Sequence, residues 1–228
     1  MADKNVSLEA SDIFSLGGNF IPQSTTKTRN VEYATMIKAN GDWQVWSGIF
    51  NGIDNISATY KYSDVTGLGA ALPNVGHVSN SYLITEISLS TIYNDYPTIS
   101  ITGHQHTDNT HVDGMTEYAI PADMTTAPLF TGQYGAYDWA GLAAGDVCAT
   151  DSTYTLSMEH QDQACADGDH WVGANLRGKE VITVNYVGVL AAYPAVIAGW
   201  TVTATALNDS NSEFDKSTVT AERIVLRV

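Results

Sequence analysis

The sequence predicts an all-β fold, an antiparallel β-sandwich or barrel with little helix. Segments that alternate between polar and apolar residues recur along the chain, for example at 56–62 and 98–102. This period of two places one set of side chains on each face of a strand. Charged residues make up only 15% of the chain, so we expect a surface rich in Ser, Thr and Asn. No alternation of strands and helices indicates a parallel sheet.

The N-terminal part of the chain predicts an arm followed by three strands. Residues 1–30 are mostly polar and are expected to form an extended N-terminal arm. The turn signal Asn40-Gly41-Asp42 separates predicted strands at 31–38 and 43–50. A second Asn-Gly pair at 51–52 is expected to turn the chain into a third strand over 56–62, which would complete a meander.

The rest of the chain is expected to join these strands in a single β-sandwich domain over residues 31–228. Its strands would be separated by long loops. A Gly-rich stretch predicts the first loop at about 63–81, and two more are expected at about 103–150 and 161–178. Long loops within a compact domain are uncommon and are often functional.

The strands between and after these loops have clear signals. Residues 82–92 and 98–102 predict a hairpin, with Asn, Asp and Pro in the turn between them. The apolar stretch 180–189 is a predicted central strand. Residues 198–207 and 217–228 predict a closing hairpin of high β propensity. We expect about nine or ten strands in total.

Charge is distributed unevenly along the chain. The formal net charge is −15, and no Lys or Arg lies between Tyr62 and Leu176. An acidic surface repels phosphate groups, so ordinary nucleic-acid binding is not expected. Such a surface is either a solvated acidic face, a face that must not bind DNA, or one that takes up Ca²⁺.

Neither the N-terminus nor the apolar stretches predict membrane insertion. Residues 1–14 lack the apolar core of a secretion signal. The longest apolar run, 187–200, is interrupted by Gly and Pro and is too short to span a bilayer. We therefore expect synthesis in a cytoplasm. Cys148 and Cys165 are expected to be free thiols there, although a bridge between them is geometrically feasible.

Three histidines near the middle of the chain are the best candidates for metal ligands. His104 and His106 alternate on one face of a strand, and His111 follows closely. Such a set could bind one ion and would support a metal-dependent, cupin-like enzyme. The Glu that cupins carry soon after the HxH pair is missing. We therefore prefer the interpretation that these are polar loop histidines without a metal.

Two further kinds of binding site have weaker signals. Asp162, Asp167 and Asp169 resemble part of a calcium loop, but their spacing does not match an EF-hand. The chain has 5 Trp and 12 Tyr residues, which could form the platform of a carbohydrate-binding module, although such residues more often pack in cores and interfaces. No nucleophile elbow, phosphate-binding loop or dinucleotide motif is present. We predict no catalytic residue and no cofactor.

The layout of the whole chain combines a polar start (MADKNVSLEASDIFSLGGNF), an NGDW turn, a Gly-rich loop and a closing segment, GWTVTATALNDSNSEFDKSTVTAERIVLRV. This layout resembles bacteriophage virion structural proteins and, among them, tail-tube subunits. The resemblance implies a sandwich that forms hexameric rings, which stack around an acidic, DNA-conducting lumen. It also implies partners among copies of the chain and other virion proteins, and a place in the virion after synthesis in the host cytoplasm. A capsid decoration or connector protein is an alternative within this class.

Overall fold

The computed structural model describes residues 11–41, 43–62, 71–92, 95–106, 117–121, 142, 146–164, 171–197, 199–209 and 214–225. For residues 31–37, 43–51, 162–164 and 171–172 it describes the backbone alone. The strands are β1 (Phe20–Ile37), β2 (Trp43–Tyr62), β3 (Val78–Ser79), β4 (Tyr82–Ile92), β5 (Thr98–His106), β6 (Cys148–Ala164), β7 (Trp171–Val187), β8 (Val196–Ile197), β9 (Trp200–Asn208) and β10 (Lys216–Val225).

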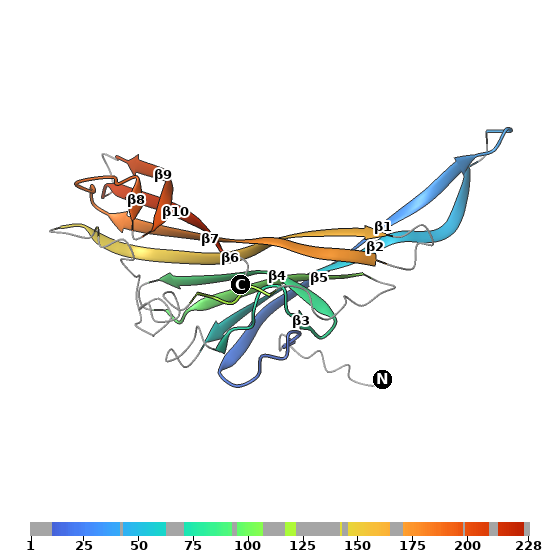
Figure 1. The fold of residues 1–228 in the computed structure, drawn as a ribbon, viewed down its shortest axis with the longest axis horizontal. Helices are drawn as coiled ribbons and strands as arrows, with labels where there is room; N and C mark the ends of the chain where they lie inside the picture. Colours follow the sequence, from blue (N-terminus) through green and yellow to red (C-terminus); the bar gives the residue numbers. More distant parts are fainter. Residues whose placement is uncertain are drawn as a thin grey trace, which may run out of the picture.

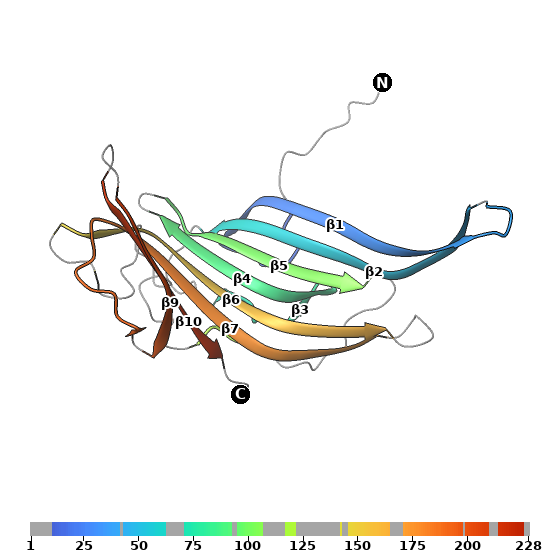
Figure 2. The same cartoon turned by 90° about the horizontal axis from the view of Figure 1, so that it is seen from above.

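These strands form one antiparallel sheet in the order β1-β2-β5-β4-β6-β7-β10-β9-β8, and β3 pairs with β4. Figure 2 shows the long strands lying side by side, and Figure 1 shows the twist of the sheet and the β1–β2 hairpin that projects from it. The predicted all-β antiparallel class is confirmed and is consistent with a sandwich. The sheet is open rather than closed into a barrel, because its two outermost strands do not pair with each other.

One face of the sheet carries the hydrophobic core. Alternate residues of the central strands point to this face and are almost completely buried, as the strand period requires. They include Tyr60 on β2, Ile101 on β5, Leu89 on β4, Tyr154 on β6 and Ile182 on β7. The long aromatic and branched side chains of these strands therefore form one continuous apolar layer.

Segments outside the main strands cover this layer. Phe14, Val75, Tyr118 and Leu190 are all buried against it. Val75 and Tyr118 exchange two backbone hydrogen bonds of 3.0 and 2.7 Å, which hold their two segments together. A Cβ atom at Gly178 of β7 would lie only 2.9 Å from the Tyr118 ring, so this glycine makes room for the aromatic side chain.

The first strands differ from the prediction in two ways. Residues 20–30 are not a separate arm, because β1 begins at Phe20 and pairs with β2 along its length. The predicted turn at 51–52 is also wrong, since β2 runs through it as one strand. The register shifts there, between the pairs Asn30↔Ile53 and Glu32↔Phe50. Gly52 therefore marks a bulge in a long hairpin and not a turn between two strands. A glycine inside a strand is typical of such a bulge.

Two predicted loops are shorter than expected. β5 continues past Gly103 to His106, because residues 103–106 still pair with β2. The predicted loop at 161–178 is wrong at both ends, since β6 and β7 remain paired from Met158↔Gly178 out to Ala164↔Trp171. This part of the hairpin lies beyond the last β4–β6 pair, Glu86↔Ser157. The outer part of the β6–β7 hairpin is not paired with β4. Its sequence lacks the alternation of apolar and polar residues from which a strand is predicted.

Among the described residues, no helix is long and apolar enough to cross a membrane.

Candidate functional site

The face of the sheet opposite the core carries rows of hydroxyl groups. Cross-strand pairing aligns these residues from one strand to the next, and each is partly exposed. One row consists of Thr59, Ser100, Ser88 and Thr155, and a parallel row consists of Thr98, Ser90, Thr153, Thr183 and Thr220. The polar half of each alternating strand thus builds a single hydroxyl face.

Neighbouring hydroxyls on this face bond to one another across strands. The oxygen atoms of Thr59 and Ser100 are 3.3 Å apart, and those of Ser88 and Thr155 are 3.1 Å apart. Thr183 and Thr220 form a third pair at 3.1 Å. Such pairs stabilise adjacent strands and leave a surface that is polar without being charged.

Six charged side chains around the hydroxyl face lie in ion pairs. Three pairs with N–O distances of 2.7, 2.8 and 2.5 Å are Lys61–Asp95, Arg177–Glu159 and Lys179–Glu222. Glu86 and Asp151 also lie on this face and add two further carboxylates. Many other carboxylates lie outside the described residues, so the predicted acidic surface remains a prediction.

A buried carboxylate joins the two strands of the β1–β2 hairpin. Asp54 on β2 is 3% exposed and pairs with Arg29 at 2.6 Å and Lys27 at 2.9 Å, both on β1. The Arg29 hydrogen bond, with a further contribution from Lys27, lowers the pKa of Asp54 to about 2 despite the opposing effect of burial. Lys27 also donates a 2.9 Å hydrogen bond to Tyr82 on β4. This cluster fixes the edge strand to the sheet.

A second buried carboxylate fixes the C-terminal hairpin. Glu180 on β7 is completely buried and accepts a 2.6 Å hydrogen bond from the Tyr154 hydroxyl. Arg223 on β10 pairs with the same carboxylate, and its guanidinium lies 4.5 Å from the centroid of the Trp200 ring on β9. Charge pairing and cation–π contact together connect β7, β10 and β9.

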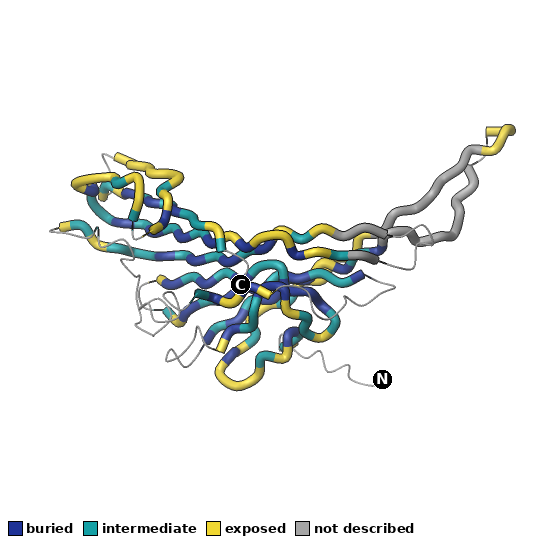
Figure 3. Tube along the Cα trace, viewed as in Figure 1, coloured by how far each residue is buried: buried dark blue, intermediate teal, exposed yellow. Residues whose placement is uncertain are grey.

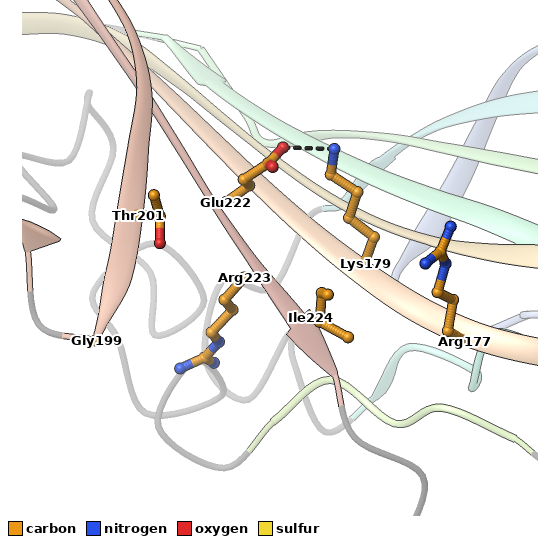
Figure 4. Close-up of a pocket in the computed structure, with 7 residues that line it drawn as sticks. All are labelled: Arg177, Lys179, Gly199, Thr201, Glu222, Arg223 and Ile224. Carbon is orange, nitrogen blue, oxygen red and sulfur yellow. Dashed lines mark ion pairs between the residues drawn. The ribbon is translucent and has the colours of Figure 1, made fainter. Parts of the chain in front are cut away.

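A hollow of about 650 Å³ lies beside this cluster (Figure 4). It is lined by Arg177, Lys179, Gly199, Thr201, Glu222, Arg223 and Ile224. Three of the chain's ten basic residues therefore lie together here. Each of the three is paired with a carboxylate, namely Glu159, Glu222 or Glu180. The hollow is thus close to neutral and has no surplus positive charge with which to bind an anion.

In the structure, the described histidine next to His104 and His106 is His160 rather than the predicted His111. The ring centroids of His104 and His106 are 5.8 Å apart, and that of His104 is 5.2 Å from His160 on β6. His160 Nδ1 lies 2.6 Å from Asn175 Oδ1 on β7. β4 pairs with β6 only as far as Ser157, whereas its pairing with β5 continues to Leu83↔His104. His160 therefore lies beyond the end of the β4–β6 pairing, where it comes close to His104. The position of His160 at the end of an alternating segment was visible in the sequence, but its partner strand was not.

Among the described residues, no group of three or more His, Cys, Asp or Glu side chains could hold a metal ion. His111, Asp167 and Asp169 lie outside the described residues, as does the side chain of Asp162. The predicted histidine site and the calcium loop therefore remain predictions at those positions. Cys148 is a free, exposed thiol, whereas Cys165 lies outside the described residues.

Comparison with protein-family models finds no family that matches the chain. Comparison with curated proteins finds no significantly similar sequence.

Proposed function

We propose that this chain is a self-assembling structural protein of the tail-tube type, which builds rings around a passage for DNA. The single observation that carries the proposal is the hydroxyl face, because it is polar, lined mainly by uncharged hydroxyl groups and made by the sheet itself. Its pairs Thr59–Ser100, Ser88–Thr155 and Thr183–Thr220 span the central strands of an open sheet. In the proposed ring this face lines the passage, and the covered face points outward.

The charge pattern supports a passage that does not hold DNA. The central strands β5, β4 and β6 all lie within the stretch that contains no Lys or Arg. DNA binding depends on cations that neutralise phosphates, so a surface without them does not retain the duplex. The hydroxyls remain hydrated or bond to each other, and the carboxylates in the same stretch add repulsion. A passage lined by hydroxyl groups and carboxylates is suited to letting DNA move through it and not to binding DNA.

Electron microscopy of the purified chain at increasing concentration, with mass measured in parallel, tests this function. Rings or stacked tubes with a central hole are the expected result. A chain that stays monomeric at every concentration, with or without a virion extract to initiate assembly, would contradict the proposal. A closed particle that lacks a central hole would favour the capsid decoration or connector alternative.

A metal-dependent enzyme that uses His104, His106 and His111 is the alternative class of function. His111 lies outside the described residues, and the described neighbours His104, His106 and His160 do not form a group that could hold a metal ion. Elemental analysis of protein purified without chelators distinguishes the two classes. Stoichiometric Zn, Mn, Fe or Ni that is lost in a His104→Ala variant would support the enzyme. A carbohydrate-binding module would instead bind glycans in a screen and lose that binding on chelation.

A further inference from the structure

The chain contains two Asn-Gly pairs, and the structure places them in different surroundings. Asn40-Gly41 lies at the tip of the β1–β2 hairpin, beyond the last strand pair of that hairpin, Ile37↔Trp43. Asn51-Gly52 lies inside β2, where the strand continues on both sides of it. The same dipeptide therefore occurs once in a turn and once in a paired strand.

An asparagine followed by a glycine can lose its side-chain amide without an enzyme. The backbone nitrogen of the glycine attacks the asparagine Cγ, and the bond from Cγ to Nδ2 breaks. The attacking nitrogen gives up its proton, and ammonia leaves as a succinimide ring closes. Water then opens the ring at either carbonyl group and leaves an aspartate, or an isoaspartate whose main chain runs through the side chain. Glycine favours this reaction because it has no Cβ atom to hinder the attack.

The tip of the hairpin leaves Asn40 open to this reaction. Residues 38–41 are all exposed, and Figure 3 shows the tip in yellow, the colour of exposed residues. A Cβ atom built on Gly41 would meet no atom within 4 Å, so the described residues leave open space beside it. The Gly41 nitrogen donates a 2.8 Å hydrogen bond to the Lys38 carbonyl. A single hydrogen bond at an exposed tip opens readily, because water replaces it at little cost.

Strand pairing protects the second Asn-Gly pair. β2 is paired with β1 on both sides of it, at Phe50 and at Ile53, and Gly52 is buried. Ile53 also begins the pairing of β2 with β5. The ring closes only when the asparagine backbone turns the next nitrogen towards its own side chain, and a paired strand holds the backbone extended. Asn51 could therefore react only after β2 separates locally from its neighbours.

We propose that Asn40 is a site of spontaneous deamidation in the folded chain and that the strand protects Asn51 from the same reaction. The co-reactant is water, and each event releases one molecule of ammonia. Either product adds a negative charge at the tip of the hairpin, and isoaspartate also lengthens the main chain of the turn. The tip thus changes its charge and shape as the protein ages. This modification does not depend on the proposed function.

Peptide mass spectrometry of the full chain, after incubation in a mildly alkaline buffer, tests the proposal. The chain unfolded in guanidinium chloride is the reference, because both Asn-Gly pairs are then accessible and should react at nearly equal rates. In the folded chain we expect Asn40 to react at a rate close to this reference, and Asn51 to react at least roughly tenfold more slowly. Equal rates at the two positions in the folded chain, or a slower rate at Asn40, would overturn the proposal.

Two matched variants locate the reaction. Glutamine reacts far more slowly than asparagine, because its longer side chain would have to close a larger ring. Asn40→Gln should therefore remove most of the conversion that the folded chain undergoes at its two Asn-Gly pairs, whereas Asn51→Gln should leave that conversion unchanged. Because Asn40 is exposed, its variant should fold like the natural chain, which circular dichroism checks. Conversion that persists in Asn40→Gln would show that β2 opens more readily than the turn and would overturn the proposal.

Discussion

Replacement of Asp54 by Asn tests whether an ion pair holds the β1 edge strand to the sheet. The two side chains have nearly the same shape, so the substitution removes charge and leaves packing almost unchanged. The carboxylate is 3% exposed and has lost most of its water, and it depends on Arg29 and Lys27 for stabilisation. An amide at this position would leave both cations without their counter-charge.

The lowered pKa gives the magnitude of this effect. The pKa of Asp54 falls from 3.8 to about 2, and each unit corresponds to about 1.4 kcal/mol of folding free energy. The full shift is therefore worth about 2.4 kcal/mol. Lys27 and Arg29 are 45% and 58% exposed, and solvent screens the cations. We therefore expect the Asp54→Asn variant to lose about 1–2 kcal/mol at neutral pH.

The pH dependence separates charge from packing. The folded pKa lies below the unfolded one, so this stabilisation is complete above about pH 5 and is lost as the pH falls through 3.8 towards 2. The difference between the natural chain and Asp54→Asn should shrink to about half by pH 3. Urea unfolding of dilute protein at pH 7 and pH 3, followed by tryptophan fluorescence, measures both differences.

Asp95→Asn is the matched control. Asp95 also pairs with a lysine, Lys61, at 2.7 Å, but its side chain is 44% exposed. The bond to Lys61 lowers the pKa of Asp95 as well, yet an exposed pair contributes little to folding. We expect Asp95→Asn to lower the free energy of unfolding much less than Asp54→Asn does. Equal losses in the two variants, or a loss at Asp54 that is unchanged at pH 3, would refute the ion-pair explanation.

Two further substitutions test other contacts in the sheet. Glu180→Gln should destabilise the protein by about 3 kcal/mol in urea unfolding, because it leaves the largely buried Arg223 without its carboxylate; a variant as stable as the natural chain would contradict this role. Gly103→Ala should cost about 1–3 kcal/mol, because its Cβ would lie 2.7 Å from the backbone oxygen of Leu83 and would force β5 away from β4. Thr102→Ala, on the opposite face of the same strand, is its control and should have a much smaller effect.

Local patterns were enough to predict the class of fold and much of its strand content. The alternation that buries Ile99 and Ile101 is visible in the sequence, because the side-chain period of a strand does not depend on its neighbours. The closing hairpin was also predictable, since both of its strands have high β propensity and flank a polar turn. The hydroxyl face follows from the same alternation once the strands are aligned.

Features that depend on the partner strand could not be predicted in this way. Asn51-Gly52 has the same local signal as a turn, and only the continuation of β1 alongside it makes it a bulge. The predicted third histidine was His111, the nearest in sequence, whereas the described neighbour of His104 is His160. His160 lies on a strand that the sheet order brings close, and sequence distance carries no information about that order.

The sequence by itself determined the all-β class, the two-faced strands, and a chain low in charge with no basic residue between 62 and 176. Propensity and periodicity are properties of short segments, so they can be recognised in the sequence without knowledge of the fold. The tertiary structure alone decided that the sheet stays open and that Asp54 and Glu180 hold its two flanks. These features arise from contacts between distant segments, and such contacts exist only when the order and register of the strands are fixed.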